Sequence, residues 1–129
     1  MTKYTCVLIE EDKMVASLVR FRLKRLQFDV HHLSNSNLHT LKSINADIVL
    51  IGLHTSNLNT IEILNKIRST IGARTPMVAI LSNNRQRLVI ENNKIQLEGY
   101  LSSPVSLTDL ENTILQLINQ KHNANKELS

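Results

Sequence analysis

Two kinds of hydrophobic pattern alternate along the chain. Short runs that are apolar at nearly every position are typical of parallel strands buried on both faces. Stretches in which apolar residues recur every three or four positions are typical of amphipathic helices. The strand-like runs are Tyr4–Ile9, Phe28–Leu33, Asp47–Leu53, Met77–Leu81 and Gly99–Leu101. The helix-like stretches are Lys13–Leu26, Ser36–Ile44, Ile61–Ile71, Arg85–Asn93 and one that begins at Leu107.

This alternation of strand and helix predicts an α/β domain. Five strand–helix units in sequence favour right-handed crossovers, a doubly wound parallel sheet and helices on both of its faces. In such folds ligands bind beyond the carboxyl ends of the strands. Candidate functional residues are therefore expected just after Ile9, Ile51, Leu81 and Leu101.

Length and composition support a single globular domain. The chain has 129 residues, of which 42% are hydrophobic and 20% charged, enough to bury a core of its own. We expect residues 1–120 to form the domain and residues 121–129 to be a polar C-terminal tail. The lone Cys6 excludes a disulfide framework. No apolar run is long enough to cross a bilayer and no signal peptide is visible, so we expect a cytoplasmic protein.

The formal net charge of +4 raises the question of an acidic partner such as nucleic acid. Aromatic residues make up only 3% of the chain, too few for a base-stacking platform. The cationic residues between positions 20 and 25 spread widely around a helix, and no DNA-reading module fits in the chain. A basic nucleic-acid-binding domain therefore stays as a minor alternative.

Three adjacent carboxylates follow the first predicted strand, at Glu10, Glu11 and Asp12. Clustered carboxylates repel one another unless a cation neutralises them, and oxygen ligands suit Mg²⁺. Acidic residues at a helix start are also favoured by the helix dipole without any metal. Both interpretations remain open.

The first predicted helix carries a second apolar line, formed by Met14, Leu18 and Phe21 at spacings of four and three. One interpretation is that these side chains pack against the last helix, the expected neighbour in a fold of this kind. The other is that they form a surface for a protein partner.

Four segments in order resemble the receiver domain of two-component response regulators, over roughly residues 3–120. They are CVLIEEDKMV, ADIVLIGLHTSNLNTIEILNKIR, TPMVAILS and GYLSSPVSLTDL, which begin at residues 6, 46, 75 and 99. The resemblance implies a flavodoxin-like, five-stranded parallel sheet in the order 2-1-3-4-5. It also implies a signalling role in which a histidine kinase phosphorylates an aspartate at the end of the third strand.

The resemblance further implies where that phosphorylation site would lie. The acceptor position falls on Gly52, and the position of the phosphate-pairing lysine falls on Ser103, which is followed by Pro104 as in the family. The Ser/Thr position falls on Leu81, with Ser82 next to it. The metal-binding acidic pair corresponds to Glu10 and Glu11, and the switch aromatic to Tyr100.

These residues predict a receiver that has lost its phosphorylation chemistry. Phosphoryl transfer of this type needs a carboxylate nucleophile, a metal ion and a cation that stabilises charge. Gly52 supplies no nucleophile and Ser103 no charge. Asp47 lies five residues earlier on the same strand, about 16 Å away, and cannot substitute, while His54 is expected to be a solvated loop residue. We therefore expect no enzymatic activity, no cofactor and at most weak Mg²⁺ binding at Glu10, Glu11 and Asp12.

The resemblance also implies protein partners: a kinase, a phosphotransfer protein or an output protein. In the family, the face made by the fourth helix, fifth strand and fifth helix forms dimers, and here it corresponds roughly to residues 85–103 and the last helix. An alternative is that the chain is the N-terminal receiver part of a longer transcriptional or second-messenger regulator. Because the receiver-like unit takes up almost all of the 129 residues, output from this chain itself is expected from a surface.

Two smaller departures from the family concern helix ends. Gln27 stands where a glycine usually follows the first helix, and Asn92 or Asn93 is expected to supply the left-handed residue after the fourth. Ser106, with Asp109 three residues later, predicts a capped start for the last helix.

Overall fold

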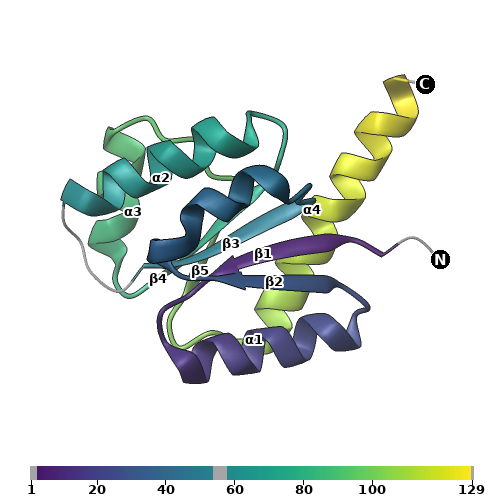
Figure 1. The fold of residues 1–129 in the computed structure, drawn as a ribbon, viewed down its shortest axis with the longest axis horizontal. Coiled ribbons are helices and arrows are strands. Elements are labelled where there is room, and N and C mark those ends of the chain that lie inside the picture. The colour runs from purple at the N-terminus through teal and green to yellow at the C-terminus, as the bar shows by residue number, and fades with distance from the viewer. Residues whose placement is uncertain (1–2, 54–57, 129) are drawn as a thin grey trace.

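The computed structural model describes residues 3–53 and 58–128 of the chain (Figure 1). Strands and helices alternate along it, as the sequence predicts. In chain order the elements are β1 (Thr5–Ile9), α1 (Lys13–Arg25), β2 (Asp29–Leu33), the 3₁₀ helix η1 (Asn35–Ser43), β3 (Ile48–Leu53), α2 (Leu58–Ile71), β4 (Met77–Leu81), α3 (Asn84–Asn92), β5 (Gly99–Ser102) and α4 (Leu107–Leu128).

The strands form one parallel sheet in the order β2-β1-β3-β4-β5, which confirms the expected doubly wound fold. Because all strands run in the same direction, their carboxyl ends meet at one edge, toward which the arrows point in Figure 1. Their register places Gly52 of β3 opposite Ile80 of β4. We call this side the carboxyl edge and the opposite side the amino edge.

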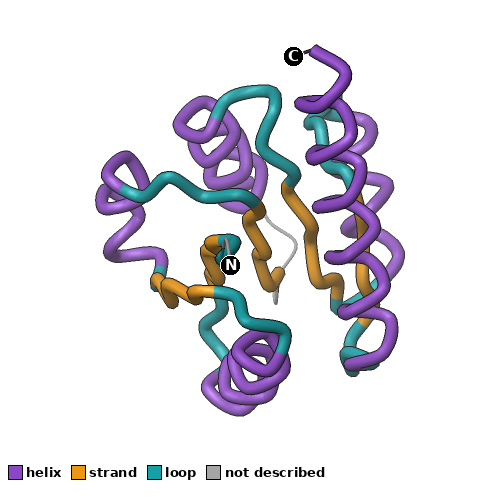
Figure 2. Tube along the Cα trace, turned by 90° about the vertical axis from the view of Figure 1, so that its right-hand side faces the viewer, coloured by secondary structure: helices purple, strands orange, loops and turns teal. Residues whose placement is uncertain are grey.

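Helices cover the sheet on both faces (Figure 2), and each face has its own apolar core. On one face, α1 and α4 bury residues that include Val19, Leu23, Leu110 and Ile114. On the other face, η1, α2 and α3 bury Leu41, Leu64, Ile67 and Ile90. The central strands β1, β3 and β4 are buried on both sides, which explains why their sequences are continuously apolar.

The helix predicted at residues 36–44 is a 3₁₀ helix in the structure, with a non-helical residue at Asn37. Short polar side chains bond locally to its backbone: the Thr40 hydroxyl donates to the Asn37 carbonyl at 2.8 Å, and the Ser43 hydroxyl to the Thr40 carbonyl at 2.8 Å. Such bonds compete with regular α-helical geometry. Periodicity located this element but did not reveal its type.

Two helices end on left-handed residues that are not glycine. Gln27 has φ +67°, and Lys94 has φ +57°. The prediction that Asn92 or Asn93 supplies the left-handed residue is wrong, since Asn93 has φ −91°. After α1 the Phe28 N–H bonds to the Leu23 carbonyl at 3.0 Å and the Gln27 N–H to the Lys24 carbonyl at 2.9 Å, the two bonds of a Schellman motif.

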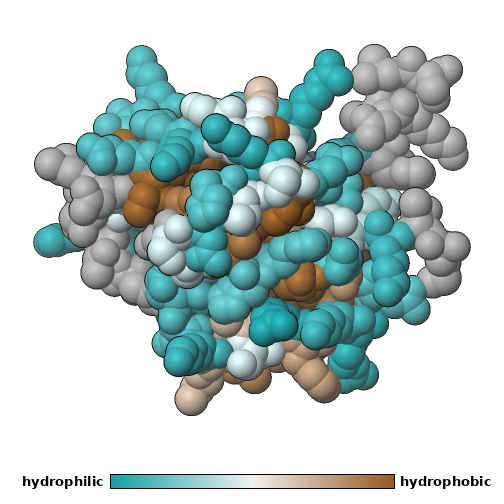
Figure 3. Space-filling view, viewed as in Figure 1, coloured by the Kyte–Doolittle hydropathy of each residue, from teal (hydrophilic) through white to brown (hydrophobic). Residues whose placement is uncertain are grey.

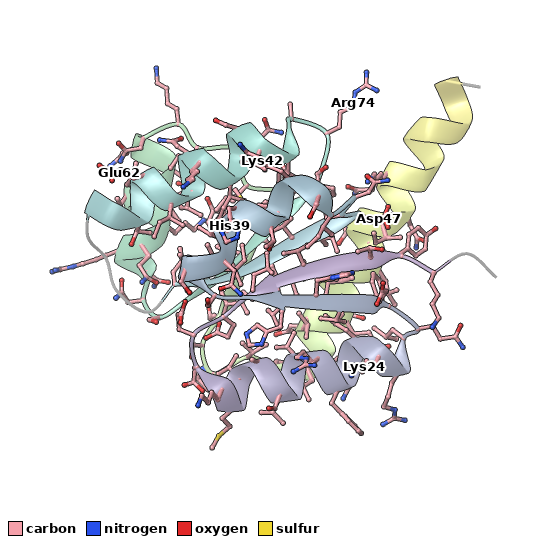
Figure 4. All side chains as sticks on the ribbon, viewed as in Figure 1. Lys24, His39, Lys42, Asp47, Glu62 and Arg74 are labelled. Carbon is pink, nitrogen blue, oxygen red and sulfur yellow. The ribbon has the colours of Figure 1, made fainter. Side chains whose placement is uncertain are left out.

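The last helix begins as predicted, with the Asp109 N–H donating to the Ser106 hydroxyl at 3.2 Å. It continues as helix to Leu128, through the segment predicted as a polar tail. Lys121 binds back to the amino edge, where its ammonium lies 3.6 Å from Asp47 Oδ1 (Asp47 is labelled in Figure 4). In the two described stretches of the chain, no helix combines the length and the apolar character needed to cross a membrane.

Candidate functional site

The carboxyl edge brings together the residues that the sequence assigns to a degenerate phosphorylation site. Gly52 is the penultimate residue of β3, and Glu10 directly follows β1 on the neighbouring strand. Leu81 ends β4, and Ser102 pairs with it at the end of β5. The loop residue His54, weighed as a substitute acceptor, lies outside the described residues.

Glu10 is the central feature of this edge. It is buried, with only 2% of its surface exposed. An ideal Cβ built on Gly52 would lie 2.5 Å from Glu10 Cδ and 3.0 Å from its Oε1, and closer still to Oε2. The carboxylate of Glu10 therefore occupies the space that any side chain at position 52 would need.

The other two carboxylates of the acidic cluster lie apart from this position. Asp12 is the N-cap of α1, and its Oδ1 accepts the N–H groups of Met14 and Val15 at 2.9 and 3.1 Å. Glu11 is exposed. Asp12 is therefore an acidic residue at a helix start, as the interpretation without a metal expects.

These residues do not fit the Mg²⁺ site that the fold family implies. Glu10 Oε1 accepts the Asp12 N–H at 3.1 Å and its carboxylate points into the space at Gly52, so the three carboxylates do not converge. Within residues 3–53 and 58–128, no group of three or more His, Cys, Asp or Glu side chains is placed to hold a metal ion.

Leu81 and Ser82 take structural roles at the end of β4. Leu81 is 5% exposed and belongs to the apolar core. The Ser82 hydroxyl donates to the Leu53 carbonyl at 2.8 Å, at the end of β3. A Ser82 hydroxyl held in this way ties two strand ends together.

Gln86 also connects the ends of β3 and β4, and the sequence interpretation missed this residue. It is 2% exposed, and its Nε2 donates to the Leu53 carbonyl at 3.1 Å. Its Oε1 accepts the Ser82 N–H at 2.6 Å, and Asn83 and Gln86 form a capping box at the start of α3. The signal was present in the sequence, because Asn83 followed three residues later by Gln86 is a capping-box pattern. We call Ser82, Gln86 and the Leu53 carbonyl the β3–α3 latch.

The remaining family positions lie on β5 and just beyond it. Ser103 and Pro104 are exposed, and the peptide bond between them is cis. Tyr100 is partly buried, and the guanidinium of Arg87 lies over its ring, 4.6 Å from the centroid. Burial raises the pKa of the Tyr100 phenol, the carboxylate of Glu91 raises it further, and Arg87 opposes both. Tyr100 is therefore a neutral side chain between α3 and β5 at physiological pH.

The apolar line on α1 is exposed, so of the two interpretations, packing against the last helix is wrong. Met14, Leu18 and Phe21 are 74%, 52% and 65% exposed. Helix α1 meets α4 through a different side, where Arg22 pairs with Glu111 at 2.8 Å. In Figure 3 apolar side chains protrude along the lower edge of the molecule, below α1, among hydrophilic ones. We call Met14, Leu18 and Phe21 the α1 surface.

Comparison with known proteins shows which solved structures share the fold of this chain. No protein-family model matches the chain, and no curated protein matches it by sequence. Solved structures do match: a CheY-like response-regulator receiver domain from Methanospirillum hungatei has a TM-score of 0.80 at 12% identity, over 95% of this chain and 99% of that one.

Two further solved structures share this fold. The receiver domain of the sensor histidine kinase PA1611 from Pseudomonas aeruginosa, with a magnesium ion in its active-site cleft, has a TM-score of 0.76 at 17% identity, over 92% of this chain and 99% of that one. Full-length FixJ from B. japonicum has a TM-score of 0.78 at 21% identity, over 98% of this chain but 63% of that one. The chain therefore has the fold of response-regulator receiver domains.

Proposed function

We propose that this chain is a cytoplasmic, non-catalytic signalling module of the two-component type that works independently of phosphorylation, with no acceptor at the usual receiver position. The observation that carries the proposal is the pair Gly52 and Glu10. Position 52 has no nucleophile, and the space around it is filled by a buried carboxylate from β1. A phosphodonor would find neither an acceptor nor room at this point.

The neighbouring positions support the same conclusion. Leu81 is part of the apolar core and has no side-chain hydrogen-bonding group for a phosphoryl oxygen. Ser103 carries no charge to balance a phosphate. The loss of these groups together is expected once the acceptor is gone, because their chemistry serves only a phosphorylated aspartate.

The α1 surface is the part of the molecule best suited to a protein partner. Met14, Leu18 and Phe21 lie along one line of the helix and leave apolar side chains in water. The helix around them carries exposed Lys13, Lys24 and Arg25, and residues 13–25 contain no acidic side chain. Two copies of α1 would therefore repel each other, and an amphipathic helix with an acidic rim is the complementary partner.

A first experiment tests the lack of phosphorylation. The purified chain is incubated with a small phosphodonor and Mg²⁺ and its intact mass is measured, with an active receiver domain as the positive control. We expect no mass increase, because position 52 offers no carboxylate. A phosphoryl group mapped to a defined residue would contradict the proposal.

A second experiment tests the α1 surface with the helical-bundle domains of kinases and phosphotransfer proteins as probes. Leu18→Glu is expected to weaken binding at least about tenfold, because an apolar contact is lost and a charge is placed in the interface. Leu88→Glu on α3 is the matched control, since Leu88 is 59% exposed on another element. Equal weakening by both variants, or weakening by Leu88→Glu alone, argues against the α1 surface.

A second proposed surface is the face formed by α3, β5 and α4. Leu88, Val89 and Leu115 are exposed on these helices, and a cavity of about 370 Å³ lies between β5 and α4 beside Tyr100. We propose this face for homodimers or for the output domain of a longer regulator. Leu88→Glu would then lower the dimer fraction in analytical ultracentrifugation, whereas Leu18→Glu would not. Nucleic-acid binding would instead require a steep loss of affinity with salt.

A further inference from the structure

We propose that Glu10 is the resident occupant of the acceptor pocket: its carboxylate, carried by β1, takes the place of the side chain that position 52 of β3 lacks, and closes the pocket to both Mg²⁺ and a phosphodonor. This inference deepens the proposed function and rests on it. The pocket then contains a carboxylate, that of Glu10, in place of the aspartate carboxylate that receivers carry at this position.

Geometry makes Glu10 and Gly52 a matched pair. Every other residue of β3 carries an apolar side chain, so Gly52 is the one position on this strand that leaves space for a neighbour. That space is taken by Glu10, since the distances from an ideal Cβ at position 52 to Glu10 Cδ and Oε1 are only 2.5 and 3.0 Å. A side chain at position 52 and Glu10 in its present orientation exclude each other.

The side chain of Glu10 points into the protein, although a carboxylate near the surface would ordinarily be solvated. A carboxylate is costly to bury and is normally solvated when solvent is within reach. The next residue, Glu11, is exposed, whereas Glu10 is buried at 2% exposure. Glu10 Oε1 accepts the N–H of Asp12, and Asp12 in turn caps α1, so the carboxylate is built into the start of that helix.

The occupied pocket adjoins the β3–α3 latch. Leu53 follows Gly52, and its carbonyl accepts bonds from Ser82 and Gln86. The end of β3 therefore has the Glu10 carboxylate on the side of β1 and the latch on the other side. We infer that the pocket has one internally completed arrangement, which makes the domain constitutive rather than switched by phosphate.

The Asp12 amide reports directly on this occupant, because its N–H donates to Glu10 Oε1. Hydrogen exchange of this amide, followed by NMR, is compared in wild type, Glu10→Ala, Gly52→Ala and the double variant. Glu10→Ala removes the acceptor, and Gly52→Ala displaces it, so both are expected to speed exchange at Asp12 by about tenfold or more. Gly52→Ala in the Glu10→Ala background is expected to add nothing.

Glu10→Gln is the matched control, because its amide oxygen has the same reach and still accepts the bond. Exchange at Asp12 should then stay within about threefold of wild type. Two results would overturn the proposal that Glu10 occupies the pocket. One is an Asp12 amide that stays protected in Gly52→Ala, and the other is that the effects of Glu10→Ala and Gly52→Ala on exchange simply add.

A Mg²⁺ titration tests the closure of the pocket. Wild type is expected to show no saturable Mg²⁺-dependent shifts at millimolar metal. Gly52→Asp displaces Glu10 toward Glu11 and adds a third carboxylate, so it is expected to gain a saturable response, since clustered carboxylates suit Mg²⁺. Gly52→Asn, which displaces Glu10 without adding charge, should respond less. Saturable Mg²⁺ binding by wild type at this edge would overturn the proposal that Glu10 closes the pocket to Mg²⁺.

The outcomes separate this inference from the proposed function. Phosphorylation of wild type at another residue would remove the proposed function, while the Asp12 readout could still show Glu10 in the pocket. Conversely, if hydrogen exchange at the Asp12 amide does not change with substitutions at position 52, the proposal about Glu10 is wrong. The proposed function as an unphosphorylated signalling domain would still stand.

Discussion

The two edges of the sheet are held together by different interactions. At the amino edge, Arg68 of α2 donates to the carbonyls of Gly72, Thr75 and Gln96 and pairs with Glu98 at 2.7 Å. Glu98 also accepts the N–H of Met77 at 2.8 Å. We call Arg68 and Glu98 the amino-edge clasp, since they join the end of α2 to the starts of β4 and β5.

The interactions described at the carboxyl edge are of another kind. The buried Glu10 carboxylate lies in the space at Gly52, and the β3–α3 latch, whose side chains are uncharged, bonds to the end of β3. In an open site, polar groups at this edge would be available to a ligand. Here the side chains of Glu10, Ser82 and Gln86 hydrogen-bond to backbone groups of the protein itself.

The largest effect is expected at the amino-edge clasp. Arg68→Ala removes three backbone contacts and leaves Glu98 without its cation, which should lower the free energy of unfolding by about 2–4 kcal/mol. Urea denaturation monitored by circular dichroism measures this loss. Arg74→Ala is the control: Arg74 is exposed (Figure 4), and its loss should change stability by less than about 0.5 kcal/mol.

A smaller effect is expected at the carboxyl edge. Gln86→Ala removes the acceptor for the Ser82 N–H and one donor to Leu53, whose carbonyl keeps its bond from Ser82. The expected loss is about 1–3 kcal/mol, with faster hydrogen exchange in the first turn of α3. Exposed Arg85 provides the control variant Arg85→Ala. A loss larger than that of Arg68→Ala would reverse the ranking of the two edges.

The smallest effect is a gain in stability at the amino edge. Gln27 holds a left-handed conformation that costs a side-chain-bearing residue energy, so Gln27→Gly should raise the free energy of unfolding by about 0.5–1 kcal/mol. Arg25→Gly, in the last turn of α1, should instead lower it by about 0.5–1 kcal/mol, because glycine is unfavourable within a helix. Equal signs for the two variants would show that left-handed strain is not what matters at position 27.

Much of the fold could be predicted from local pattern. The β4 strand is found at the predicted residues Met77–Leu81, because a short apolar run between a proline and polar residues permits little else. The assignment of the acceptor position to Gly52 rests on the spacing of the sequence and stays a prediction. The contents of the candidate site were predicted less well: Gln86 was missed, although its capping-box spacing was visible.

Side-chain direction accounts for the other errors. The spacing of Met14, Leu18 and Phe21 shows only that they share a line on α1. It left open whether that line faces α4, and in the structure Arg22 lies on the side of α1 that faces α4 instead. Similarly, the acidic cluster predicts three carboxylates close in sequence. It does not predict that Asp12 caps a helix while Glu10 is buried.

The alternation of elements, the parallel sheet and the lack of a nucleophile at position 52 can all be read from the sequence, because they depend on residue types and their spacing along one chain. What fills the space at position 52 depends instead on how the strands pack in the folded protein. Glu10 and Gly52 are distant in sequence and meet because β1 and β3 are neighbours in the sheet. The space left by a glycine is visible only when the strand beside it is in place, and here that strand supplies a carboxylate.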